Sequence, residues 1–250
     1  MTGPSQPETA IRIADPTRKS AFVTGLLYLI TFAASIPAVV LLSPILDDPN
    51  YVVGPGADMQ IGLAAVLDMV NAVACIGTAV AVFSVVKRQH EGLALGFVTT
   101  RLLEAAIIAA GVVSLLAVVT LRQEGVAAGD AGSAVVVGRA LVAVRDGTFV
   151  LGPCLMAALN ALMFGTLLYR ARLIPRAIPA LGLVGAPVMI AFVICTMLGL
   201  TELGSTFNAI AGAPFFIWEL LAGLWMVFKG FDRSAPIVAA AMAESSLRRD

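Results

Sequence analysis

The sequence predicts an all-α polytopic membrane protein, a transmembrane helical bundle of six spans with both termini cytosolic. Three observations predict it. Of the 250 residues, 59% are hydrophobic and only 13% are charged, whereas soluble domains carry about 25% charged residues. Uncharged apolar runs recur that are long enough to cross a bilayer core about 30 Å thick. The lysines and arginines also gather in alternate connecting segments, as the positive-inside rule describes.

The first apolar run follows a polar tail. Residues 1–20 contain three prolines and few apolar side chains, so we expect a disordered cytosolic tail. Residues 21–43 then carry no charge. This run exceeds the 7–15 apolar residues typical of a signal peptide, which predicts a first span that is retained.

The same length test predicts five further spans. Their approximate bounds are 60–86, 93–120, 148–169, 177–200 and 208–228, and a cytosolic tail covers 231–250. Segment 131–147 has apolar residues at helical spacing, but Arg139, Arg145 and Asp146 make it too polar to span. It is either an external interfacial helix or an extension of the fourth span.

The basic residues predict the orientation. With the N-terminus in the cytosol, twelve of the 16 Lys and Arg residues are cytosolic, three are external, and Arg101 lies in a span. The cytosolic ones are Arg12, Arg18, Lys19, Lys87, Arg88, Arg170, Arg172, Arg176, Lys229, Arg233, Arg248 and Arg249; the external ones are Arg122, Arg139 and Arg145. This asymmetry predicts a multi-pass membrane protein with both termini inside.

Four ionisable residues fall within the predicted spans: Asp68, Arg101, Glu104 and Glu219. An Arg or Asp at the centre of a spanning helix costs roughly 2.5–3.5 kcal/mol on insertion scales. Such residues therefore face other helices or water, which makes them candidates for a functional site.

Depth estimates bring most of these polar residues to one level. At about 1.5 Å per residue from the cytosolic end, Arg101 lies at ~13 Å, Glu104 at ~18 Å, and Glu219 and Asn160 at ~15 Å. In a core about 30 Å thick these four levels surround the midplane. Two further candidates are higher on the second span: Asn71 lies at ~22 Å and Asp68 at ~27 Å.

Two interpretations of this polar cluster stay open. Arg101 and Glu104 are three residues apart on one helix and can pair, which favours a structural staple between the third and sixth spans. Glu219 is on a helix of opposite direction and its side chain tilts away from Arg101, which weakens a direct bridge. The other interpretation is a functional polar site or cavity. With one cation facing two carboxyl groups, we expect one carboxyl to hold a proton or to face water.

Few other motifs carry chemistry. His90 is the single histidine, so no His-based metal site can form. Three separated cysteines, Cys75, Cys154 and Cys195, predict small buried apolar residues. There is no zinc-protease, serine-hydrolase or phosphate-loop motif. We therefore expect no enzyme, no metal and no cofactor, and the net charge of zero gives no reason to expect nucleic acid.

Four stretches resemble a known family: "GLLYLI" (25–30), "RLLEA" (101–105), "LIPRAIPALGLVG" (173–185) and "WELLAGLWMVFKG" (218–230). Together they are similar to the bacterial polytopic membrane proteins that share domain of unknown function 4386, over about residues 18–231. The resemblance implies a multi-helix inner-membrane protein and no activity, substrate or cofactor. It also implies that certain residues are family-pattern positions, namely Arg101, Glu104, Pro175, Arg176, Glu219, Trp225 and Gly230. Region 122–147 resembles the family pattern least.

Three classes of function remain. The first is a non-catalytic accessory, stress or immunity protein, in which the cluster only fixes helix packing. The second is a small-solute or proton-coupled transporter that uses the cluster, and the third is an intramembrane enzyme. The first is favoured because six helices offer few polar groups for a solute. The lipid bilayer is the expected partner, and a homo-oligomer or a membrane partner protein stays open.

Overall fold

The computed structural model describes residues 16–125 and 131–247, and the regular structure of these residues is helical throughout. The predicted tail 1–20 is described only from Pro16, where the first helix already begins, and residues 1–15 lie outside the described residues. The elements are α1 (Pro16–Leu41), α2 (Ser43–Asp47), η1 (Tyr51–Val53), α3 (Asp58–Val86), α4 (Glu91–Gly125), α5 (Ala131–Phe149), the π-helical η2 (Val150–Met156), α6 (Ala157–Ala171), α7 (Ala177–Met197), α8 (Thr206–Phe228) and α9 (Pro236–Leu247).

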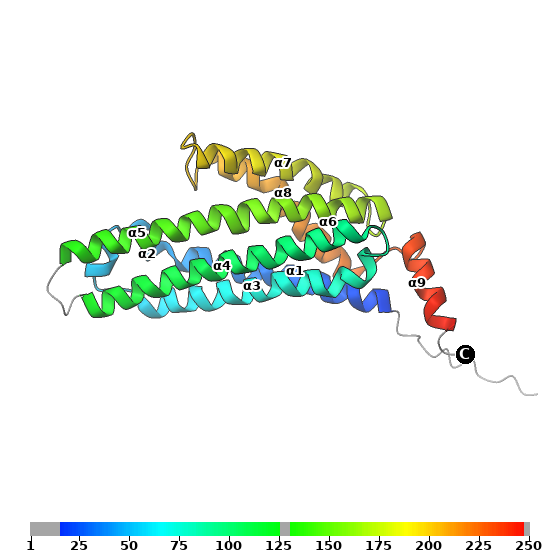
Figure 1. The fold of residues 1–250 in the computed structure, drawn as a ribbon, viewed down its shortest axis with the longest axis horizontal. Helices are drawn as coiled ribbons and strands as arrows, with labels where there is room; N and C mark the ends of the chain where they lie inside the picture. Colours follow the sequence, from blue (N-terminus) through cyan, green and yellow to red (C-terminus); the bar gives the residue numbers. More distant parts are fainter. Residues whose placement is uncertain (1–15, 126–130, 248–250) are drawn as a thin grey trace, which may run out of the picture.

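Six of the described helices are long and apolar enough to cross a membrane, which confirms the predicted fold class. They are Thr17–Leu41, Asp58–Val86, Glu91–Glu124, Ala131–Ala171, Ala177–Met197 and Thr206–Phe228. Because their number is even, α1 begins and α9 follows on the same side, as Figure 1 shows. We call this the termini side, and the opposite side the far side.

Segment 131–147 lies in one long helix with the fourth span, so it is an extension of that span and not a separate interfacial helix. The helix Ala131–Ala171 has 41 residues and a length of about 60 Å, twice the thickness of a bilayer core. Its far half therefore extends beyond the length that crossing a bilayer core requires, and it lies beside the far end of α4 (Figure 1). Arg145 and Asp146 thus lie on the same continuous helix as the predicted fourth span, on the extension that precedes it.

The long helix changes to π geometry over η2, where Gly152 and Pro153 occur. Proline has no N–H to donate to the preceding turn, so the regular ladder is interrupted there. Gly152 lies against α4, and a Cβ atom at this position would be 3.1 Å from Cγ2 of Ile107. The distortion therefore falls where the helix crosses α4, one turn from Glu104.

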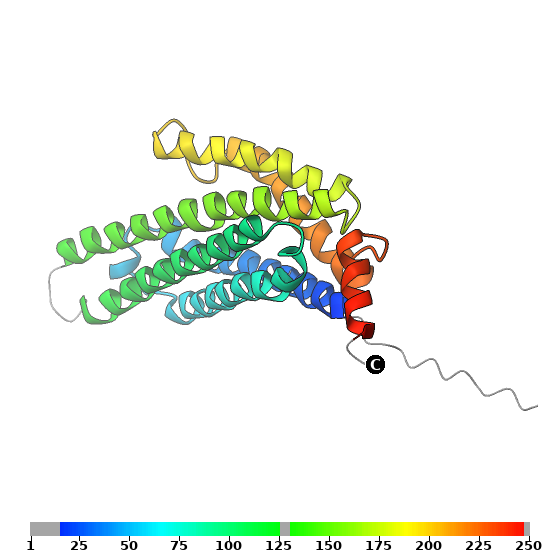
Figure 2. The same ribbon diagram turned by 45° about the vertical axis from the view of Figure 1, so that its right-hand side comes forward.

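The helices form a bundle from which one hairpin diverges. Helices α1, α3, α4 and the α5–α6 helix run side by side, whereas the α7–α8 hairpin packs closely near the termini side and diverges toward the far side (Figures 1 and 2). Near the termini side α8 crosses α1 at two glycines: a Cβ on Gly25 would be 2.6 Å from the carbonyl oxygen of Gly223. Small residues allow such close helix crossings in membranes.

The first turns of α1 hold the end of α8. The Arg18 guanidinium donates hydrogen bonds to the carbonyl oxygens of Met226 and Val227, over 3.0 and 2.8 Å. The last carbonyls of a helix have no partner within the helix, so a basic side chain there stabilises its end. Arg18, at the start of the first span, thus holds the end of the last span in place.

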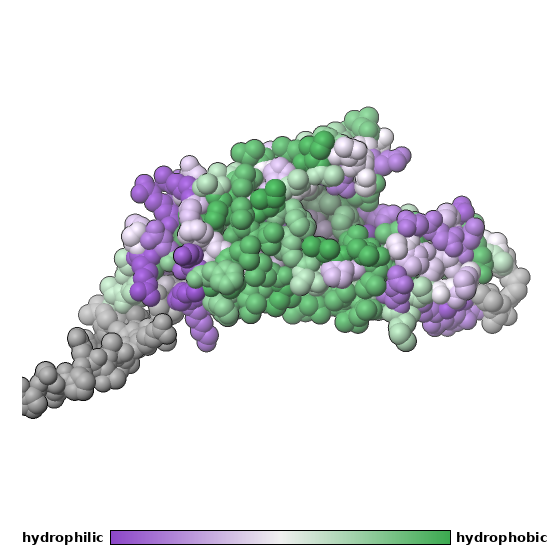
Figure 3. Space-filling view, turned by 180° about the vertical axis from the view of Figure 1, so that it is seen from behind, coloured by the Kyte–Doolittle hydropathy of each residue, from purple (hydrophilic) through white to green (hydrophobic). Residues whose placement is uncertain are grey.

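The surface has the pattern that a bilayer requires. Figure 3 shows one face of the molecule, with an apolar belt across its middle and polar side chains gathered toward both ends. On α3, Val66, Val73 and Val80 are each about 60% exposed and recur every seven residues on one helix face. An outward apolar stripe of this kind is stable in hydrocarbon, so the lipid bilayer is the environment of these helices.

Candidate functional site

Arg101 lies at the centre of the polar cluster. It is on α4 and only 2% exposed. One terminal nitrogen donates to Oε2 of Glu104 over 3.1 Å, and the other donates to Oε1 of Glu219, on α8, over 3.0 Å. Charge-assisted bonds of this kind are the main compensation for burying a cation in an apolar bundle.

Aromatic rings cover the guanidinium. Its carbon lies 4.9 Å from the centre of the Tyr28 ring, on α1, and 5.8 Å from that of Phe97. The Sγ of Cys75, on α3, also lies 3.5 Å from one terminal nitrogen. Ring faces attract cations most strongly where water is excluded, so the cation interacts with α1, α3, α4 and α8 at once.

Asn160 adds α6 to the cluster. It is 1% exposed, and its side-chain nitrogen donates to Oε2 of Glu104 over 2.6 Å. Its side-chain oxygen accepts a hydrogen bond from the hydroxyl of Thr100. Both ends of the amide are thus satisfied, as a buried polar group requires.

Four of the six predicted site residues therefore meet: Arg101, Glu104, Glu219 and Asn160. The direct Arg101–Glu219 bridge exists although the two side chains tilt oppositely, because both side chains are long enough to close the gap. Asn71 is adjacent, at hydrogen-bonding distance (3.8 Å) from the Cys75 sulfur.

Asp68 is outside the cluster. It lines a separate small cavity of about 50 Å³ together with Arg145. The Arg145 guanidinium is 4.9 Å from the Phe149 ring and 3.7 Å from the Asp146 carboxylate. Phe149 and Asp146 thus compensate the charge of Arg145. This cavity lies nearer the far side than the cluster does, because Asp68 is one helical turn beyond Asn71 on α3.

Sequence reasoning missed Tyr28, Phe97, Cys75 and Thr100 as members of the cluster. A signal existed for Cys75, since it shares a helix face with Asp68 and Asn71. Phe97 and Thr100 lie one turn before Arg101 and Glu104, on the same side of α4. Tyr28 carries no pairing signal in the sequence, because its partner is on a helix 73 positions away.

A cavity of about 630 Å³ extends from the cluster toward the far side. Its floor includes Arg101, Glu104 and Glu219, and its walls come from α1, α3, η2, α7 and α8. Toward the far ends of α1 and α8, it reaches Val40 and Asn208. It therefore occupies the space that the diverging α7–α8 hairpin leaves, and Figure 3 shows a recess between this hairpin and the body of the bundle.

The floor of this cavity is open at specific atoms. The side chain of Glu219 is 13% exposed, against 3% for Arg101 and 5% for Glu104. The Nε of Arg101 is buried and has no hydrogen-bond partner among the described residues. Only Oε1 of Glu219 has a described donor, which leaves Oε2 without one. An acceptor oxygen without a donor at the bottom of a cavity is typical of a binding site.

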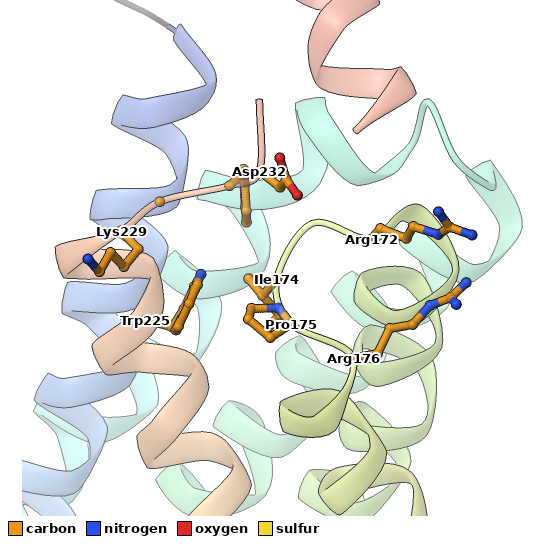
Figure 4. Close-up of a pocket in the computed structure, with 9 residues that line it drawn as sticks. Arg172, Ile174, Pro175, Arg176, Trp225, Lys229 and Asp232 are labelled. Atoms are coloured by element: carbon orange, nitrogen blue, oxygen red, sulfur yellow. The ribbon is translucent and has the colours of Figure 1, made fainter. Parts of the chain in front are cut away.

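A second cavity, of about 470 Å³, lies on the termini side between α8 and the α6–α7 turn. It is drawn in Figure 4, where Trp225 faces Ile174 and Pro175 while Arg172 and Arg176 extend away from Lys229. The three cations thus do not converge on one point. Arg176 lies over the Tyr169 ring, 5.0 Å from its centre, so this region has the character of a helix junction.

That junction is held by the backbone. The amide of Asp232 donates to the carbonyl oxygen of Leu173 over 2.9 Å. The Asp232 carboxylate accepts hydrogen bonds from the amide and hydroxyl of Ser234, and these bonds lower its pKa. The segment after α8 therefore packs onto the α6–α7 turn, and this contact positions the start of α9.

An ion pair ties the far ends of α3 and α4. Arg122 pairs with both carboxylate oxygens of Asp58, and the Tyr51 hydroxyl donates to the same carboxylate over 3.0 Å. Burial raises the pKa of Tyr51. Residues of two predicted loops and two helix ends thus make one compact group outside the apolar belt.

Within residues 16–125 and 131–247, no three His, Cys, Asp or Glu side chains are placed to hold a metal ion. The charged groups that line the large apolar cavity are one guanidinium, from Arg101, and two carboxyl groups, from Glu104 and Glu219.

Comparisons with known proteins give a family and nothing more. No curated protein matches the chain significantly, and neither does any solved structure. Residues 23–230, most of the sequence, match the family described as "Domain of unknown function (DUF4386)". This confirms the predicted resemblance, and the matched range includes all six spanning helices except the first turns of α1. The chain, a multi-pass membrane protein, belongs to the DUF4386 family.

Proposed function

We propose that this chain is a non-catalytic membrane protein of accessory, stress or immunity type, in which the Arg101 cluster fastens the helices. It acts in the plasma membrane of a bacterium with both termini in the cytosol. The observation that carries the proposal is that both terminal nitrogens of Arg101 pair with carboxyl groups, one with Glu104 and the other with Glu219. A guanidinium that pairs with two carboxyl groups and is covered by two aromatic rings is suited to a structural role.

The staple is tested by thermal unfolding of the purified protein in detergent. Arg101→Met leaves two buried carboxyl groups without their cation, and breaking a buried pair costs about 3–5 kcal/mol in soluble proteins. We expect a large fall in the unfolding temperature of Arg101→Met. The triple variant with Glu104→Gln and Glu219→Gln should recover much of it, because no unpaired charge remains.

Arg172→Met is the matched control, since this arginine lies in the open termini-side cavity and should change stability little. An Arg101→Met protein as stable as wild type would end the staple proposal. Equal losses for the single and triple variants would also oppose it, because the loss would then reflect packing and not charge.

A second candidate function is a small-solute or proton-coupled transporter. The observation that favours it is the cavity of about 630 Å³ whose floor includes all three charged residues. Opening on one side of a charged midplane site is the arrangement that alternating access requires. Solute flux into proteoliposomes that Glu219→Gln abolishes while the fold stays intact would support transport. A homo-oligomer or a membrane partner protein is compatible with either function.

A further inference from the structure

The apolar cavity above Glu219 has the size and the access of a small-molecule site. Its volume of about 630 Å³ falls in the usual range of roughly 300–1,000 Å³ for ligand pockets. Its mouth is made by exposed apolar residues of two spans: Ile36 and Val40 on α1, and Phe216 and Ile217 on α8, are 45 to 67% exposed. A ligand therefore enters from the hydrocarbon, so most of its surface is apolar.

The charges at the floor define the rest of the ligand. Among the described residues that line the cavity, Arg101 is the one cation, and Glu104 and Glu219 are the anions. Arg101 neutralises one carboxylate, so the ionised floor carries one net negative charge. Since Glu219 is the more open carboxyl and its Oε2 has no described donor, this charge faces the cavity.

Aromatic rings strengthen the match to a cation. Phe32 and Phe216 pack edge to face across the α1–α8 boundary with ring centres 4.5 Å apart. Phe149 and Phe215 also line the cavity. Ring faces attract organic cations, and quaternary ammonium groups are recognised by aromatic cages.

We propose that this cavity binds a lipophilic organic cation, with the positive centre beside Glu219 and the apolar body between α1 and α8. This goes beyond the proposed function, because the staple needs no ligand. It also gives a role to the carboxyl group that Arg101 does not neutralise. Either a proton or the bound cation neutralises Glu219, so binding of the cation to the protonated form releases one proton.

The groups that face Glu219 are compatible with this exchange. Arg101 and Glu104 come from α4, Cys75 from α3 and Tyr28 from α1. The remaining titratable group lining the cavity is the Cys154 thiol of η2, and α7 contributes only the thioether of Met189. Because Arg101 stays paired with Glu104, Glu219 is the group whose charge changes.

Binding of radiolabelled tetraphenylphosphonium to the purified full chain in lipid nanodiscs tests this proposal. We expect saturable binding that Glu219→Gln weakens at least tenfold, about 1.4 kcal/mol, and that weakens as the pH is lowered, because protonation of Glu219 competes with the cation. Glu202→Gln is the matched control, since Glu202 is exposed in the α7–α8 loop and its loss should leave binding unchanged.

A second pair of variants keeps the charges. Ala213 is exposed and lines the cavity, whereas the neighbouring Ile210 is 63% exposed and does not line it. Ala213→Trp should block binding and Ile210→Trp should not. This pair decides the question if Glu219→Gln fails to fold.

Tetraphenylborate, an anion of matched size, should show no saturable site. The proposal is overturned if the anion binds as the cation does, since the cavity would then be an apolar groove only. It is also overturned if neither Glu219→Gln nor Ala213→Trp weakens cation binding. Either result leaves the staple untouched, because the staple is judged by unfolding temperature alone.

Discussion

Arg101 and Glu219 are 118 residues apart and lie on helices of opposite direction, yet their side chains meet at 3.0 Å. This contact joins the third and sixth spans across the bundle. It also leaves an imbalance, since Arg101 simultaneously pairs with Glu104 and one cation cannot neutralise two carboxylates. In a medium of low dielectric constant such an imbalance is costly, and the first prediction follows from it.

We predict that the ligand-free protein contains one buried, protonated carboxyl group in the cluster. Infrared difference spectra titrated between about pH 5 and pH 9 should show its carbonyl band, and Glu219→Gln or Glu104→Gln should remove or shift it, because the remaining carboxyl is then neutralised by Arg101. Glu202→Gln, in an exposed loop, should leave the band in place. A spectrum without any buried protonated carboxyl over this range would contradict the prediction.

Asn160→Ala should destabilise the protein by about 1–3 kcal/mol. It removes the donor that lies 2.6 Å from Glu104 and leaves the Thr100 hydroxyl without its amide partner, and a buried polar group that loses its partner costs about that much. The readout is thermal or denaturant unfolding in detergent.

Thr99→Ala is the matched control for Asn160→Ala. Thr99 is exposed on the same helix as Thr100 and bonds only to the Leu95 carbonyl of its own helix. Its loss should change stability by a few tenths of a kcal/mol. Equal effects of the two substitutions would show that the buried amide adds nothing to the cluster.

The class of fold and the level of the cluster could be predicted because each depends on local properties. Span length follows from runs of apolar residues, and depth follows from a fixed rise per residue. Arg101, Glu104, Glu219 and Asn160 were therefore expected at one level. That their side chains meet depends on how each helix is rotated and on which helices are neighbours. Neither can be predicted from apolar runs and residue spacing.

Other features were out of reach for the same reason. The cavity arises because the α7–α8 hairpin diverges from α1, and divergence is a property of helix pairs (Figure 2). Segment 131–147 could not be assigned because Arg145 and Asp146 suggest water, whereas in the folded chain Arg145 is buried and lies against Phe149 and Asp146. Both the cavity and the conformation of segment 131–147 thus depend on tertiary contacts.

Gly25→Ala should destabilise the protein by about 1–3 kcal/mol, as overpacking of a tight interface does. The added Cβ would lie 2.6 Å from a backbone oxygen of α8, so the two helices must separate. Gly62→Ala is the matched control, because a Cβ there meets no atom within 4 Å. It should be neutral or slightly stabilising, since alanine favours helix. Similar unfolding temperatures for the two variants would show that the α1–α8 crossing tolerates expansion.

The orientation of the six spans is the last prediction. Among the described residues, nine Lys and Arg residues lie toward the termini side and three lie toward the far side, which predicts that the termini face the cytosol. A green fluorescent protein fused after residue 250 should fluoresce, because it folds in the cytosol. Alkaline phosphatase fused after residue 203, in the α7–α8 loop, should be active, because it requires the periplasm. The two reporters exchanged between these sites provide the control: both should then be silent at equal expression. Activity in the exchanged pair would invert the topology and would place the cavity mouth, which opens toward the far side, in the inner half of the membrane.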